Sequence, residues 1–117
     1  MKNKFVLLLL LLLIIFAGIS YGEGFDGNQW LKEKPNNKNS YVKGYIDGAN
    51  SASGFLPKEC KYDKAEFTKH DINYYVKQTN EFYKNYPYFK NILVKDVLLQ
   101  MSDFLDRNIH EIARTYS

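Results

Sequence analysis

Residues 72–87 of this 117-residue chain read INYYVKQTNEFYKNYP, and this stretch decides the fold class. Core-type side chains recur in it at intervals of three and four, the period of one helical face, at Ile72, Tyr75, Val76, Thr79, Phe82, Tyr83 and Tyr86. Pro87 forbids continuation of a helix. Thr68 lies three residues before Asp71, a capping-box spacing that predicts the cap at Thr68. The stripe is wide enough to face a core.

A second stripe follows this helix. Asn91 is the expected cap, and the apolar face consists of Val94, Val97, Leu98, Met101, Phe104 and Leu105. The same period reaches Ile109 and Ile112. Opposite charges four residues apart, Asp103 with Arg107 and Arg107 with Glu111, would support an extension of the helix that far.

Two more helices are expected before residue 54. Asn28 would cap a short helix that contains Trp30 and ends near Lys34, and the asparagine-rich residues 35–39 predict a turn. Ser40 would cap the next helix, whose core face is Val42, Ile46, Ala49 and Ser53. No stretch alternates long enough to predict a sheet. The expected fold class is all-α, a small bundle of four or five helices.

Gly44, Gly48 and Ala52 form a stripe of small residues along that helix. A glycine inside a helix costs about 1 kcal/mol relative to alanine, so two of them need a reason. We expect close approach of another helix, either within the chain or across a homodimer. A backbone surface held open for a ligand is the functional alternative.

The N-terminus has the layout of a secretory signal peptide. Lys2 and Lys4 precede an apolar run over residues 5–19, and residues 20–22 offer small side chains for cleavage after Ser20 or Gly22. The run is short for a bilayer span, although an uncleaved anchor is the alternative. We expect a signal peptide over 1–22, a single helical domain over 23–117, and a periplasmic or secreted protein that is not a lipoprotein and keeps no stable membrane anchor.

The mature chain offers little electrostatic attraction for nucleic acid. Loss of Lys2 and Lys4 would lower the net charge from +3 to +1, and recognition of nucleic acid needs a basic surface. Nucleic acid is therefore not an expected partner.

Residues that could carry catalysis are sparse. Cys60 is the single cysteine, so no intramolecular disulfide can form; burial is the expected state of its thiol, and an intermolecular bridge or a reactive group are the alternatives. His70 and His110 each have a carboxylate four residues earlier, but a catalytic zinc site usually needs three protein ligands. Cys60 with His70 is the one conceivable nucleophile and base pair, and no motif surrounds it. We expect neither an enzyme nor a metal or other cofactor.

Aromatic side chains crowd the segment between the two clearest helices. Tyr83, Tyr86, Tyr88 and Phe89 lie there, with Lys84 and Lys90 beside them. These rings either wedge the helices together or form a surface for a partner, since tyrosine is favoured at interfaces. The irregular segment 54–63 is the other candidate surface, because long loops often carry function.

Four short motifs resemble the Rap/Tai family, the immunity proteins of type VI secretion amidase effectors. They are Lys43-Gly44-Tyr45-Ile46-Asp47-Gly48, Phe55-Leu56-Pro57, Phe82-Tyr83-Lys84-Asn85-Tyr86-Pro87 and Leu93-Val94-Lys95-Asp96-Val97-Leu98. The chain departs from the family pattern in lacking paired cysteines, with Phe55 where the family has a loop cysteine, and residues 106–117 extend beyond the usual end.

The resemblance implies an exported helical domain that blocks a peptidoglycan amidase by protein–protein contact. The candidate partner-binding residues are Phe55, Leu56, Lys58, Tyr86, Tyr88 and Phe89. Two alternatives stay open: a periplasmic stress or chaperone-like helical protein, and an enzyme that uses Cys60.

Overall fold

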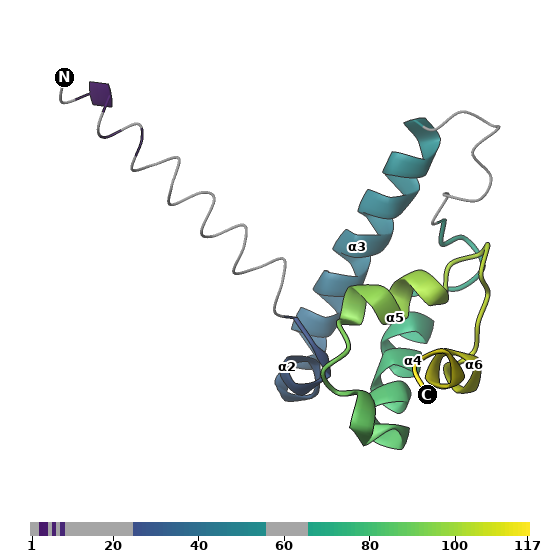
Figure 1. The fold of residues 1–117 in the computed structure, drawn as a ribbon. Helices are drawn as coiled ribbons and strands as arrows, with labels where there is room; N and C mark the ends of the chain where they lie inside the picture. The colour runs from purple at the N-terminus through teal and green to yellow at the C-terminus, as the bar shows by residue number, and fades with distance from the viewer. Residues whose placement is uncertain (1–2, 5, 7, 9–24, 56–65) are drawn as a thin grey trace.

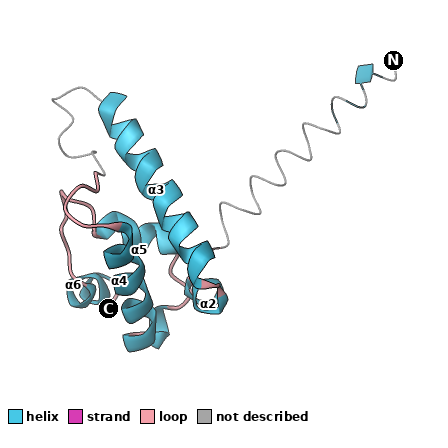
Figure 2. Ribbon diagram, turned by 180° about the vertical axis from the view of Figure 1, so that it is seen from behind, coloured by secondary structure: helices cyan, strands magenta, loops and turns pink. Residues whose placement is uncertain are grey.

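The computed structural model describes residues 3–4, 6, 8, 25–55 and 66–117. Most of the expected signal peptide, its cleavage site, and Leu56, Lys58 and Cys60 lie outside the described residues. The elements are α2 (Gly27–Lys32), α3 (Pro35–Phe55), α4 (Ile72–Asn85), the 3₁₀-helix η1 (Pro87–Phe89), α5 (Val94–Gln100) and α6 (Ile109–Thr115). The described part of the chain has no β-strand, and the predicted all-α bundle is confirmed (Figures 1 and 2).

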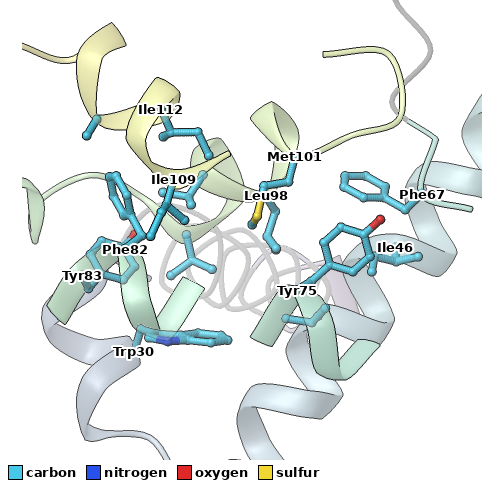
Figure 3. Packing of buried hydrophobic residues seen from close by; sticks show 14 residues of the cluster. Trp30, Ile46, Phe67, Tyr75, Phe82, Tyr83, Leu98, Met101, Ile109 and Ile112 are labelled. Atoms are coloured by element: carbon cyan, nitrogen blue, oxygen red, sulfur yellow. The ribbon is translucent and has the colours of Figure 1, made fainter. Parts of the chain in front are cut away.

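Helix α4 is the centre of the bundle, because α2, α3, α5, α6 and η1 all pack against it. Its predicted stripe faces the core: Tyr75, Thr79, Phe82 and Tyr83 are buried. Figure 3 shows the side chains that converge on them from the other elements, among them Trp30, Ile46, Phe67, Leu98, Met101, Ile109 and Ile112. None of the helices in the described residues is both long and apolar enough to cross a membrane.

The N-cap of α4 is Asp71, and the prediction of Thr68 was wrong. The Asp71 carboxylate accepts a hydrogen bond from the Tyr74 N–H at 2.9 Å. The Thr68 hydroxyl and N–H instead donate to the carboxylate of Asp103, at 2.6 and 2.9 Å. Thr68 therefore binds the Asp103 carboxylate, from a segment distant in sequence, instead of capping α4. The predicted end of the helix is confirmed, since α4 ends at Asn85, two residues before Pro87.

Helix α3 begins at Pro35, so the turn predicted over residues 35–39 is wrong, as is the cap predicted at Ser40. Proline is well suited to the first helical position, where its missing N–H would have no intrahelical acceptor. The asparagines continue the helix, and the Asn37 side chain donates to Glu33 Oε2 at 2.9 Å. The predicted core face is confirmed, with Val42, Ile46 and Ser53 buried and Ala49 half-buried.

The small-residue stripe of α3 lies on its exposed face. Gly44, Gly48 and Ala52 are all exposed, and a Cβ added at either glycine would meet no atom within 4 Å. Among residues 25–55 and 66–117, no helix packs against this stripe, so the predicted close approach within the chain is not found there. Its role in a homodimer stays a prediction.

The first helix is capped by Asp26, two residues before the predicted Asn28. The Asp26 carboxylate accepts from the Gln29 N–H, and the Gln29 side chain accepts from the Asp26 N–H, which completes a capping box. The two reciprocal bonds satisfy two backbone donors, whereas Asn28 is exposed within the helix.

The last helical stretch is broken in two, so its predicted extension is wrong. Helix α5 starts after Leu93, not after a cap at Asn91, and ends at Gln100. A turn follows in which Asp106 adopts a φ of 46°, and Asn108 caps α6 by accepting from the Glu111 N–H at 2.9 Å. The Asp103 carboxylate that would have paired with the next turn faces Thr68 instead.

Candidate functional site

The candidate site is the turn between α4 and α5, where η1 redirects the chain. The Tyr86 N–H closes α4 by donating to the Phe82 carbonyl at 2.9 Å, and Pro87 starts η1. The Phe89 N–H then donates to the Tyr86 carbonyl at 3.0 Å, and the Ile92 N–H to the Phe89 carbonyl at 3.0 Å. Successive backbone bonds of this kind fix the turn.

Aromatic rings stack behind this turn. The buried ring of Phe82 lies 6.2 Å from that of Phe89 with an interplanar angle of 12°, and 5.8 Å from that of Tyr86. Phe89 in turn lies 6.1 Å from Tyr116, just past the end of α6. We call Tyr86, Tyr88, Phe89, His110 and Tyr116 the aromatic corner.

Helix α6 holds the corner through His110. The Tyr86 hydroxyl is hydrogen-bonded to His110 Nδ1, and the two rings meet edge to face with centroids 6.0 Å apart. His110 is exposed and Tyr86 is half-buried. The bond therefore joins Tyr86, the residue between α4 and η1, to a helix more than 20 residues further along the chain.

The start of the domain fastens the corner from the other side. The Gly27 N–H donates to the Lys90 carbonyl at 2.8 Å, the Val94 N–H donates to the Phe25 carbonyl at 3.0 Å, and Asp26 pairs with Leu93 in an isolated antiparallel bridge. Residues 25–27 and 90–94 thus lie side by side, and we call these two segments of the chain the clamp.

Tyr83 fills the space beneath this clamp. Its hydroxyl donates to the Ile92 carbonyl at 2.7 Å, and burial raises the pKa of Tyr83 well above its usual value, so the group stays a neutral donor. A Cβ added to Gly27 would come within 2.2 Å of the Tyr83 ring. Glycine is required at position 27 because the ring packs directly against the backbone.

Tyr88 is the one member of the corner that projects fully. Its side chain is 93 % exposed, against 37 % for Tyr116, while Tyr86 and Phe89 are half-buried. Of the six predicted partner-binding residues, the structure brings together Tyr86, Tyr88 and Phe89. The other three give no test, because Leu56, Lys58 and the Phe55 side chain lie outside the described residues.

His110 and Tyr116 belong to the corner and were not predicted. Their approach depends on α6 folding back onto α4. A signal was available in the sequence: Ile109, Ile112, Ala113 and Tyr116 continue one helical stripe, and three of them are buried. That stripe showed a core-facing helix but not which surface its end would reach.

The described residues offer little chemistry besides this surface. No group of three or more His, Cys, Asp or Glu side chains among them could hold a metal ion. The His70 ring stacks on Tyr74 at 3.7 Å, and His70 precedes α4 instead of lying on it. Asp106 and His110 do not share a helix, because α6 begins at Ile109. Neither histidine is placed beside its predicted carboxylate on one helical face.

An open groove of about 390 Å³ lies between α3 and the start of α4. It is lined by Asn39, Ser40, Lys43, Asp71, Ile72 and Asn73. The Asp71 carboxylate is already engaged in capping α4.

Comparison with known proteins adds no relative: no family model, no curated protein and no solved structure matches this chain.

Proposed function

We propose that this protein is an exported, non-enzymatic binding domain that grips a protein partner through the aromatic corner. The more specific form of the proposal, taken from the Rap/Tai resemblance, is that the partner is a cell-wall hydrolase which the domain inhibits. The observation that carries the proposal is Tyr88, a large ring 93 % exposed on a backbone turn held from two sides.

A fixed turn makes Tyr88 suited to binding. Binding a flexible segment loses conformational freedom, and a preorganised segment avoids much of that cost. Here the backbone bonds of η1, the clamp from residues 25–27 and the bond from His110 are present before any partner arrives. Tyrosine combines a large apolar ring with a polar hydroxyl, a combination enriched at binding hot spots.

The shape of the corner favours insertion into a cleft. The chain turns between α4 and α5 (Figure 1), and Tyr88 within this turn is 93 % exposed. A protruding ring of this kind matches a concave site, and active sites of hydrolases are concave. Inhibition would then follow from occupation of the cleft without any reaction.

The test is photo-crosslinking in the producing cell. A photoreactive phenylalanine analogue placed at Tyr88 should give a covalent adduct with one protein, and the same analogue at the exposed Lys77, in the middle of α4, should not. The captured protein is then purified, and its hydrolysis of peptidoglycan is measured with and without this domain. Absence of an adduct at position 88 would refute binding through the corner, and a captured protein without hydrolase activity would refute the inhibitor role.

A matched pair of variants gives the magnitude. Tyr88→Ala should weaken inhibition by about 30-fold or more, the effect of a hot spot worth about 2 kcal/mol. Lys77→Ala should leave it unchanged.

A further inference from the structure

The segment around the aromatic corner carries positive charge on its lysine side chains. Between residues 84 and 95 the chain has Lys84, Lys90 and Lys95 and not one carboxylate. Lys84 is exposed in the last turn of α4, and Lys90 directly follows η1. Lys84 and Lys90 therefore flank Tyr88 in the chain, four residues before it and two residues after it.

The positive region continues onto α3. Lys38 donates to Asn80 Oδ1 at 2.9 Å and lies 5.3 Å from the centre of the Trp30 ring. Burial and the nearby charge of Lys84 lower the pKa of Lys38, although Glu33 acts in the opposite direction. The ammonium groups of Lys38 and Lys84 are thus close enough to repel each other.

In the part of the chain that the structure describes, neither Lys84 nor Lys90 forms a salt bridge. Within the described residues, the salt bridge is between Lys69 and Asp106, with its two atoms 3.3 Å apart. The Asp26 carboxylate accepts a hydrogen bond in capping α2 and forms no salt bridge with Lys90. Glu81 on α4 and Glu111 on α6 are further acids on these elements, and Asp96 in the first turn of α5 acts electrostatically on Tyr116; Arg114 on α6 adds a further cation.

We propose that the partner segment bound at the aromatic corner is an acidic stretch of polypeptide, whose carboxylates pair with Lys84 and Lys90 while an apolar side chain contacts Tyr88. This inference rests on the proposed function, since it names the chemistry of the partner at the same surface. A single exposed ion pair contributes little affinity. Complementary charge chiefly selects the partner and speeds association.

The test uses a random 12-residue peptide library displayed on phage and the purified protein as bait. Peptides are selected on the wild type after removal of those that bind Tyr88→Ala. The selected peptides should contain at least twice the Asp and Glu of the starting library. A fluorescent copy of the best peptide should bind about tenfold more weakly in 500 mM than in 50 mM salt.

Charge reversal gives the matched control. Selection on Lys84→Glu/Lys90→Glu should lose the acidic bias, and circular dichroism verifies that this variant is folded. If the double variant does not fold, Lys84→Glu alone serves, because Lys84 is exposed. Peptides that depend on Tyr88 but carry no acidic bias would overturn this inference and leave the proposed function standing. A library that yields no Tyr88-dependent peptide would overturn both.

Discussion

Replacing Gly27 by alanine should destabilise the fold, although alanine normally favours a helix. Gly27 is the first residue of α2 and has a negative φ, so its backbone conformation is open to alanine. The obstacle is space: the new Cβ would lie 2.2 Å from one ring carbon of Tyr83 and 2.3 Å from the next. The ring is fully buried and its hydroxyl is bonded to the Ile92 carbonyl.

The magnitude follows from what must move. Forcing an extra carbon into a well-packed core costs about 1–3 kcal/mol. Displacement of the ring also breaks the Tyr83–Ile92 hydrogen bond, worth about 1 kcal/mol. The expected loss is therefore about 2–4 kcal/mol, a large share of the roughly 5–14 kcal/mol expected for a domain of this size.

Urea unfolding of the purified protein measures this loss. Trp30 is the single tryptophan, it is fully buried, and it lies one turn from Gly27, so its fluorescence reports unfolding of this region. Gly44→Ala is the matched control, because its Cβ would meet nothing within 4 Å. That variant should gain up to about 1 kcal/mol from helix propensity.

A double-mutant cycle isolates the cause. In a Tyr83→Leu background the ring is gone, so Gly27→Ala should cost less than half as much as in the wild type. A Gly27→Ala variant within 0.5 kcal/mol of the wild type would refute the packing of Tyr83 on the α2 backbone. A Gly44→Ala variant that loses stability would show that the small-residue face is covered after all.

Two further measurements address other parts of the bundle. Burial raises the pKa of Tyr45 and Tyr75 from 10 to about 12. The folded state therefore favours the neutral phenol, and the stabilisation that results is present below pH 10 and is lost as the pH rises to 12. For the fully buried Tyr75 this loss is about 3 kcal/mol of the free energy of unfolding. Tyr75→Phe should lose correspondingly less between pH 9 and 12 in urea unfolding, and an equal loss would contradict the assignment. Asp71→Ala should cost about 1 kcal/mol by removing the α4 cap, additively with Thr68→Ala, whereas Thr68→Ala and Asp103→Ala should be non-additive because they remove the same bond.

The central helix could be predicted from sequence because its signals are local. A wide stripe of core-type side chains and a proline stop are contained within residues 72–87, and α4 ends as expected. Its cap could not be chosen in the same way. Thr68 and Asp71 are both able to cap a helix. Thr68 does not cap α4 because its hydroxyl donates to Asp103, which lies 35 residues after it.

The break between α5 and α6 shows a second limit of periodicity. The apolar spacing from Val94 to Ile112 is consistent with one helix, yet the chain turns after Gln100. The turn lets Asp103 reach Thr68 and lets α6 fold onto α4. The same apolar spacing fits one long helix or two short ones. Contacts between distant segments decide between them, and the spacing carries no information about those contacts.

The candidate site was predictable in part for the same reason. The residues from Tyr86 to Phe89 are adjacent in the chain, so the sequence alone drew attention to them. His110 and Tyr116 reach the corner only through the return of α6. The exposed glycines of α3 were misjudged because helix propensity indicates a cost at Gly44 and Gly48 without saying what offsets it.

The clamp between residues 25–27 and 90–94 has a consequence for the order in which the protein matures. Asp26 and Leu93 are separated by 67 positions along the chain, so this pairing cannot form until residue 93 has been synthesised and has folded back onto residue 26. An incomplete or truncated molecule would lack the fixed turn that carries Tyr88. Under the proposed function, partner binding would then require the complete fold, and a fusion attached directly before Phe25 would weaken it by disturbing the clamp.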